Sequence, residues 1–189
     1  MSDGRVRLFV ALELPDRVRE ALTRWRDRLT GGAGPSLRPV APEALHVTLC
    51  FLGWRGEDEI DAIAAACSVV APEPAPGLSL GVAVWLPRRR PRVLAVELGD
   101  AGARLARIQS ALSFALAAGG WYEPESRPYL AHVTVARVKE GPRKAPELPE
   151  PPHLEFHASR VVLYRSRLSR TGARYEPLAN VELTPASTA

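Results

Sequence analysis

The triplet His-Val-Thr occurs twice in this 189-residue chain, at residues 46–48 and 132–134, each time within an apolar run typical of a β-strand. Side chains at positions i and i+2 of a strand lie on the same face, so each copy presents an imidazole together with a hydroxyl. One imidazole can take a proton while the other gives one, and two hydroxyls can hold a tetrahedral anion. The pattern therefore predicts a site for metal-free cleavage of a phosphoryl ester, with both histidines and both threonines in it.

The sequence around the two triplets also repeats. Arg7 opens an apolar stretch that is followed by an amphipathic helix and, 39 residues after Arg7, by His46. Arg92 opens a similar stretch, and His132 follows it by 40 residues. This order indicates an internal duplication. Two such strand-helix-strand units, related by a pseudo-twofold axis, would face each other across a groove.

Length and charge limit the class of protein. The chain is long enough for one sizeable core and contains no long linker, so we expect residues 1–189 to form a single two-lobed domain. The formal net charge of +4 depends almost entirely on arginine, because Lys139 and Lys144 are the only lysines. Two interpretations are open: the arginines reflect genome composition, or their guanidinium groups bind a polyanion.

The two cysteines, Cys50 and Cys67, can form at most one bridge, which excludes a disulfide scaffold. We expect a cytoplasmic protein without a membrane segment, since we recognise neither a signal peptide nor a long apolar run. Cys50 has the strand parity of His46 and Thr48. Parity alone would place it in the groove, but we expect a buried inert thiol instead of a nucleophile, because no adjacent histidine of the opposite parity activates it.

Periodicity and turn residues predict the order of the elements. Helices are expected after Pro15, after Gly56 and over residues 101–118, and a loop over 139–152. Strands are expected over 5–14, 36–40, 45–52, 78–86 and 93–98, at the second triplet, and over 154–168 and 174–183, the last two joined by a turn at 169–172.

Several residues near the second triplet are candidates for binding substrate. Arg137 follows the second histidine by five positions, so it reaches the groove only if the strand ends or bulges there. Arg127 precedes a proline in the loop that leads to this strand. Trp121, Tyr122 and Tyr129 are able to stack a terminal base or to pack beneath the loop.

The sequence gives less support to a role for the other basic residues and to other kinds of chemistry. We expect His153 and His157 to be structural or exposed, because neither has a threonine two positions later. The basic turn at 88–92 is either a solvated hairpin tip or a contact to an RNA backbone. The chain has no phosphate-binding loop with lysine, and its histidines and carboxylates lack the spacing of metal ligands. We therefore expect neither a metal nor a cofactor.

The segment Arg38–Gly53, which reads Arg-Pro-Val-Ala-Pro-Glu-Ala-Leu-His-Val-Thr-Leu-Cys-Phe-Leu-Gly, resembles the first signature of a known family. This is the bacterial and archaeal 2′-5′ RNA ligase / RNA 2′,3′-cyclic phosphodiesterase family, within the two-histidine phosphoesterase superfamily. Further similar segments are Arg7–Pro15, Arg127–Arg137, Leu163–Ser166 and Gly172–Glu176. One departure is Ala131, where the family usually has proline.

The resemblance implies an α+β fold of two pseudo-twofold-related lobes of antiparallel sheet, with helices outside and a central groove. It also implies hydrolysis of RNA terminal 2′,3′-cyclic phosphates to 2′-phosphomonoesters without metal, and ligation as the reverse reaction. By the two signatures, His46 would be the proton donor and His132 the proton acceptor, beside Thr48 and Thr134. The chemistry of the residues alone leaves the two roles exchangeable.

Two other functions remain open at this stage. The same groove chemistry would serve a small cyclic nucleotide as well as an RNA end, because only the loops would differ. A non-catalytic module that binds RNA or nucleotides is also conceivable, although binding alone does not require two imidazoles on opposed strands. We expect a monomer in each case.

Overall fold

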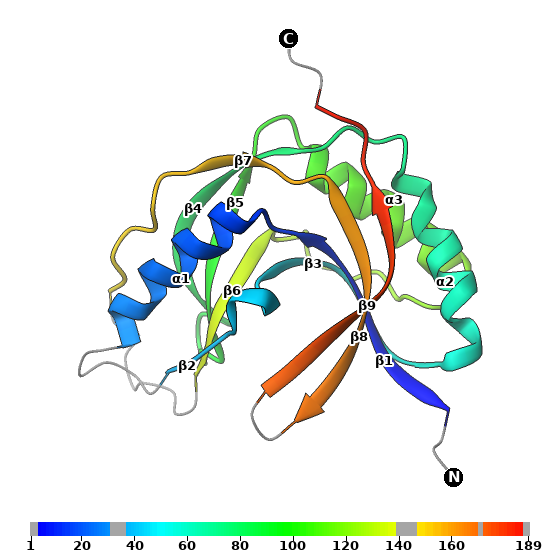
Figure 1. Ribbon diagram of the computed structural model, residues 1–189, viewed down its shortest axis with the longest axis horizontal. Coiled ribbons are helices and arrows are strands. Elements are labelled where there is room, and N and C mark those ends of the chain that lie inside the picture. Colours follow the sequence, from blue (N-terminus) through cyan, green and yellow to red (C-terminus); the bar gives the residue numbers. More distant parts are fainter. Residues whose placement is uncertain (1–3, 31–36, 139–146, 170–171, 187–189) are drawn as a thin grey trace.

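The computed structural model describes residues 4–30, 37–138, 147–169 and 172–186 (Figure 1). Residues 170–171 of the predicted turn at 169–172 therefore lie outside the described residues. So do residues 139–146 of the predicted loop at 139–152. The first half contains β1 (Arg5–Glu13), α1 (Asp16–Thr30), β2 (Leu37–Pro39), the short 3-10 helix η1 (Pro42–Ala44), β3 (His46–Gly56), η2 (Glu57–Glu59), α2 (Ile60–Cys67) and η3 (Ser68–Val70). The second half contains β4 (Gly77–Leu86), β5 (Val93–Asp100), α3 (Arg104–Ala118), β6 (His132–Val138), β7 (Glu155–His157), β8 (Arg160–Ser169) and β9 (Gly172–Glu182).

The strands form one sheet in the order β7-β4-β5-β6-β3-β1-β8-β9, with β2 paired to β6. This order is symmetric about the junction of β6 and β3, so that β5 and β6 correspond to β1 and β3. Val47 and Val133, the central residues of the two triplets, pair with each other across that junction. The predicted α+β fold with two related halves is confirmed, and the halves are joined through this pair into one curled sheet (Figure 1).

The helices cover the outer face of the sheet, with α1 toward one end and α2 and α3 toward the other (Figure 1). The apolar positions of α3 are fully buried, as helical spacing predicts: Leu105, Ile108, Leu112 and Leu116. Helix α1 contacts β2 and β6, whereas α3 contacts β3 and β5. Each of these helices thus packs on a strand of the other half, which fixes the two triplets relative to each other.

The predicted element bounds agree with the structure to within a few residues. The third helix begins at Arg104 instead of residue 101, because Gly102 and Ala103 have φ angles of 91° and 54°. The left-handed region is incompatible with a continuing right-handed helix.

A β-bulge follows the first triplet. Thr48 pairs with Ala11 on β1, and Cys50 pairs with Val10, so Leu49 has no partner in this ladder. One extra residue reverses which face the following side chains occupy. Phe51 consequently lies on the same side as the histidine of its strand.

A second bulge follows the second triplet at the equivalent place. Thr134 pairs with Ala95 on β5, and Ala136 pairs with Leu94, which leaves Val135 as the extra residue. Arg137 therefore lies on the groove face. Simple alternation along the strand would place it on the opposite face.

Candidate active site

The two triplets meet in a cavity of about 500 Å³ that both histidines and both threonines line. The pair Val47–Val133 is antiparallel, so His46 lies on the Thr134 side of the junction and His132 on the Thr48 side. The four predicted reacting residues are thus brought together from two strands whose sequence separation exceeds 80 residues. The other lining residues are Arg7, Phe9, Arg38, Pro39, Val40, Ala41, Ala44, Phe51, Arg137, Ser166, Ala173 and Tyr175.

Both imidazoles are held in the same way. His46 Nδ1 lies 2.8 Å from the carbonyl oxygen of Ala44, and His132 Nδ1 lies 2.8 Å from that of Leu130. A carbonyl oxygen only accepts, so Nδ1 carries the proton in each ring and Nε2 is the nitrogen available to a ligand. Each acceptor lies two positions before its histidine, which repeats the pseudo-symmetry at the level of single hydrogen bonds.

His46 also contacts its own threonine. The distance from His46 Nε2 to Thr48 Oγ1 is 3.1 Å, and because Nδ1 holds the ring proton, the hydroxyl donates to Nε2 in the neutral form. A ligand that accepts from Thr48 would break this bond and free Nε2. The hydroxyl of Thr48 and the imidazole of His46 thus satisfy each other.

Aromatic rings surround His46. Its ring centroid lies 4.9 Å from that of Phe9 and 5.2 Å from that of Tyr175, and Tyr164 lies at 6.4 Å. The pKa of His46 is lowered from 6.5 to about 4, chiefly by burial; the Ala44 hydrogen bond opposes the shift, and the charges of Arg137 and His132 contribute to it. In these surroundings His46 is consequently neutral at pH 7.

The lowered pKa of His46, and the direction in which an anion should shift it, can both be tested. We expect the His46 imidazole to titrate near pH 4 in the free protein, and its pKa to rise when a tetrahedral dianion fills the cavity, because the anion stabilises the imidazolium. Histidine NMR resonances followed against pH, with and without sulfate, would measure both values, and the His46→Ala spectrum would identify the signal. A midpoint near 6.5 without sulfate, or no rise with it, would contradict this description.

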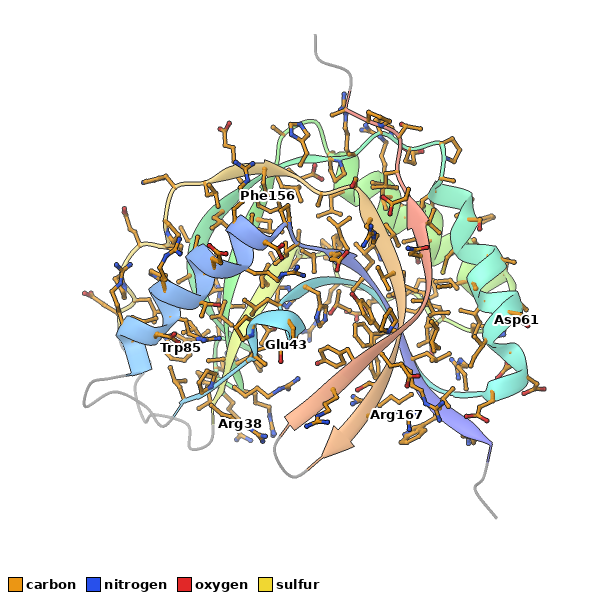
Figure 2. All side chains as sticks on the ribbon, in the orientation of Figure 1. Arg38, Glu43, Asp61, Trp85, Phe156 and Arg167 are labelled. Carbon is orange, nitrogen blue, oxygen red and sulfur yellow. The ribbon has the colours of Figure 1, made fainter. Side chains whose placement is uncertain are left out.

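Of the described residues that line the cavity, three are arginines and none is an aspartate or a glutamate. The guanidinium carbon of Arg7 lies 4.7 Å above the ring centroid of Phe51. Arg38 on β2 stands opposite Arg137 on β6 in the antiparallel ladder. Figure 2 labels Arg38 near β2. The cavity is therefore strongly electropositive.

The structure does not bring the remaining predicted substrate contacts into the cavity. Arg127 is exposed and Tyr129 is half-buried, and neither lines it. Cys50 is buried, and burial raises the pKa of its thiol to about 12. The bulge at Leu49 turns Cys50 away from the groove, so strand parity does not hold for it and the expectation of a buried thiol is confirmed.

Tyr129 has a different place, in the support of the first triplet. Its hydroxyl donates to the carbonyl oxygen of Thr48 at 3.0 Å, and Gln109 Nε2 donates to that of Leu49 at 3.4 Å. In the second bulge the carbonyl oxygen of Val135 accepts from the backbone N–H of Val40 at 3.0 Å. Each bulge is thus bonded by groups from the other half of the chain.

Several residues that line the cavity are not among those predicted from the sequence, chiefly Arg7, Phe9, Arg38, Phe51, Ser166 and Tyr175. Alternation along β1 places Arg7 and Phe9 on one face, a signal that was available. The position of Phe51 cannot be predicted without the bulge. The position of Tyr175 depends on how the last hairpin folds over His46.

Two kinds of feature are absent from the described part of the chain. It contains no group of three or more histidine, cysteine, aspartate or glutamate residues placed to hold a metal ion. No described helix has the length and apolar character needed to cross a membrane.

Comparisons with known proteins place the chain in a family. The LigT-like phosphoesterase model matches twice, to residues 12–95 and to residues 96–175, in agreement with the duplication. The RNA 2′,3′-cyclic phosphodiesterase of Escherichia coli K12 is 30% identical, with 94% of this chain and 97% of that protein covered, and its Archaeoglobus fulgidus counterpart is 34% identical over 76% and 77%. Among solved structures, a Thermus thermophilus protein has a TM-score of 0.80 at 29% identity, covering 95% of this chain and 98% of that one. Escherichia coli LigT complexed with 3′-AMP has a TM-score of 0.79 at 30% identity, covering 95% and 99%. The chain therefore belongs to the LigT-like phosphoesterase family and is a phosphoesterase.

Proposed function

We propose that this protein hydrolyses the terminal 2′,3′-cyclic phosphate of RNA to a 2′-phosphomonoester without a metal ion. The observation that carries the proposal is the pair of imidazoles, each with Nδ1 anchored on a carbonyl oxygen, that share one arginine-lined cavity with two threonine hydroxyls. Proton transfer and charge stabilisation, the two requirements of the reaction, are both supplied by side chains there. The relatives named RNA 2′,3′-cyclic phosphodiesterase support the same substrate.

In the proposed reaction His132 Nε2 takes a proton from water as the water oxygen bonds to phosphorus. The bond from phosphorus to O3′ breaks, and His46 Nε2 gives its proton to the departing O3′. Thr48, Thr134 and Arg137 would hold the non-bridging oxygens, which carry the developing charge. Ligation would be the same displacement with an RNA hydroxyl in place of water: the hydroxyl oxygen bonds to phosphorus, the bond to O3′ breaks, and a 2′-5′ phosphodiester forms.

The donor role of His46 requires a protonated imidazole, whereas burial lowers the pKa of His46 to about 4 and so favours the neutral ring at pH 7. Considered alone, that low pKa suits a base. We propose that the bound phosphate raises the pKa of His46 so that it enters the reaction charged. The sulfate titration described above tests this step directly.

The aromatic rings support the same orientation. Phe9 and Tyr175 line the cavity beside His46, and among the described residues no ring contact to His132 is found. In an in-line displacement the nucleoside carries the leaving oxygen, and water approaches from the opposite side. A nucleoside stacked beside His46 would therefore present O3′ to His46 and leave the water to His132.

We further propose that residues 1–189 act as one domain and as a monomer in the cytoplasm. One chain supplies both triplets, so the site needs no second copy. The buried free thiols Cys50 and Cys67 fit a reducing compartment.

A small cyclic nucleotide is the second candidate substrate. A cavity of about 500 Å³ is within the usual range for small-molecule sites, so its size is compatible with a nucleoside 2′,3′-cyclic phosphate alone. The reaction at phosphorus would be the same.

An RNA that ends in a 2′,3′-cyclic phosphate, incubated with the purified protein with and without excess EDTA, tests the main proposal. We expect the cyclic end to open at an unchanged rate in EDTA. The product should resist a phosphatase specific for 3′-phosphates and lose its phosphate to a nonspecific one. Recovery of a 3′-phosphate would contradict the proposed leaving group, and activity restored by one divalent ion after chelation would contradict the metal-free mechanism.

A further inference from the structure

A strip of side chains continues from the reacting groups along β1 and β3, which lie side by side (Figure 1). Residues that stand directly opposite each other in an antiparallel ladder share a face, so each pair forms one row of the strip. The row at Thr48 is followed by the row of Phe9 and Phe51, and then by the row of Arg7 and Trp54. Arg7 still lines the cavity, whereas Trp54 does not. Trp54 therefore lies on the groove face just beyond the cavity.

A further bulge in β3 places Trp54 on this face. Phe51 and Gly53 pair with consecutive residues of β1, so Leu52 is the extra residue in the ladder. Gly53 has a φ angle of 72°, in the left-handed region that favours glycine. Without this insertion, alternation after Phe51 would turn Trp54 to the face that the helices cover. The indole is instead 54% exposed on the groove side.

The backbone at Trp54 is held firmly although its ring is exposed. Its carbonyl oxygen accepts from Arg5 Nη2 at 3.2 Å and from Arg55 Nη1 at 2.9 Å. Arg55 Nη2 also donates to the carbonyl oxygen of Trp121 at 2.6 Å, which ties this part of β3 to the segment after α3. A rigid, exposed indole is a suitable platform for a nucleobase, because every base has a π face that can stack.

Positive charge accompanies the aromatic rings. Arg5 and Arg7 alternate along β1 with Phe9, and the guanidinium carbon of Arg7 lies 4.7 Å from the ring centroid of Phe51. Among the described residues, neither Arg5 nor Arg7 forms an ion pair with a carboxylate. An apolar protein surface would bury these charges without a counter-ion, whereas the phosphates of a nucleic acid would neutralise them. Rings interleaved with cations are typical of surfaces that bind single-stranded nucleic acid.

The distance along the strip suits a second nucleotide. Thr48 pairs with Ala11 and Trp54 with Arg7, four residues away on β1, which corresponds to roughly 13 Å of strand. The terminal nucleoside, which the proposed function places beside Phe9, would occupy the interval. A cyclic phosphate closes the 3′ end of an RNA, so the chain continues only on its 5′ side. The next base on that side is therefore the one that would reach Trp54.

We propose that Trp54 stacks the base of the nucleotide immediately 5′ of the terminal one, so that the enzyme favours RNA ends over nucleoside cyclic phosphates. The proposal rests on the function proposed above and specifies its substrate. Two alternatives are an indole that contacts no substrate and an indole that stacks the terminal base itself. In neither case would the base of the second nucleotide affect the reaction.

Three substrates with the same terminal nucleoside separate these cases: the nucleoside 2′,3′-cyclic phosphate, the dinucleotide with a cyclic end, and that dinucleotide with an abasic 5′ nucleotide. We expect kcat/KM to favour the normal dinucleotide over its abasic counterpart by about tenfold or more, the usual effect of one base stacked on an aromatic ring. The abasic substrate keeps the charge of the linkage, so it isolates the contribution of the base. Equal kcat/KM values for the two dinucleotides would overturn the proposal.

Variants of Trp54 assign the effect to its ring. Trp54→Ala should lower the ratio of normal to abasic kcat/KM about tenfold or more, whereas Trp54→Phe should keep most of it, because a smaller ring still stacks. Combining Trp54→Ala with the abasic substrate should cost no more than either change alone, since both remove the same contact. Fully multiplying losses, or an unchanged ratio in Trp54→Ala, would contradict stacking on Trp54.

Phe114→Ala is the matched control. Phe114 is an aromatic ring on α3 that is 80% exposed and does not line the cavity, so its replacement removes exposed apolar surface away from the strip. Its ratio of normal to abasic kcat/KM should equal that of the wild type. A loss as large as that of Trp54→Ala would show an effect common to exposed rings and would overturn the specific role of Trp54.

Indole fluorescence makes the test independent of turnover, because a base stacked on an indole quenches its emission. The dinucleotide that ends in a 2′-phosphate should quench the wild type, and its abasic counterpart and the mononucleotide should not. Trp54→Phe, which retains the other three tryptophans, should lose the quenching. Quenching that persists in Trp54→Phe, or equal quenching by the mononucleotide, would overturn the proposal. Base-dependent quenching without hydrolysis of either cyclic substrate would support the stacking site and contradict the proposed function.

Discussion

Replacing either His46 or His132 by alanine is expected to lower kcat/KM on an RNA cyclic phosphate by about 10²- to 10⁴-fold, the usual contribution of one positioned acid or base. The two imidazoles would act in a single transition state, one on the attacking water and the other on the leaving oxygen. The double variant should therefore cost much less than the product of the single losses. Initial rates over a range of substrate concentrations measure each value.

His153→Ala is the matched control, since His153 is an exposed histidine outside the cavity, and it should retain wild-type activity. The wild-type rate should have a bell-shaped dependence on pH, and each single variant should lose one limb. Single losses below tenfold, or fully multiplying losses in the double variant, would contradict a shared transition state.

A better leaving group should separate the roles of the two histidines. If the bridging O3′ of the cyclic phosphate is replaced by sulfur, the departing thiolate needs no proton, because thiols have a pKa near 8.5. His46→Ala should then recover at least about 10²-fold of its loss, since only the proton donor has become unnecessary. His132→Ala should remain slow, because the water still needs a base.

The comparison is made as the ratio of kcat/KM for the sulfur and oxygen substrates in the wild type and both variants. Recovery in His132→Ala in place of His46→Ala would exchange the two roles and would agree with the low pKa of His46 in the empty cavity. Full activity of both variants on the oxygen substrate would remove these histidines from the chemistry.

Most of the fold could be predicted because local signals and tertiary packing agree. Helix α3 shows its buried stripe in the sequence, and the strands around the two triplets alternate clearly up to their threonines. The pairing of Val47 with Val133 is harder to predict from the sequence. The repeat indicates a pseudo-twofold axis, but no local pattern shows that the two halves share one sheet.

The site was predictable as far as the alternation of each strand holds. Alternation correctly assigns His46 and Thr48 to the face that lines the cavity. It would assign Cys50 to the same face, which is wrong because Leu49 is inserted as a bulge. The equivalent insertion in β6, at Val135, turns Arg137 toward the groove. A bulge is set by partners far along the chain, here Tyr129 and Gln109, so a single strand's sequence does not reveal it.

The pairing of the two central valines has a further consequence for how a ligand lies in the cavity. A perfectly twofold site would accept a nucleotide equally well in two inverted orientations, and the inverted one would present the leaving oxygen to the wrong imidazole. The third residue after each threonine removes this degeneracy, because one half has Phe51 there and the other has Arg137. One substitution between equivalent positions thus distinguishes an aromatic end from a cationic end, and it gives two identical triplets unequal surroundings.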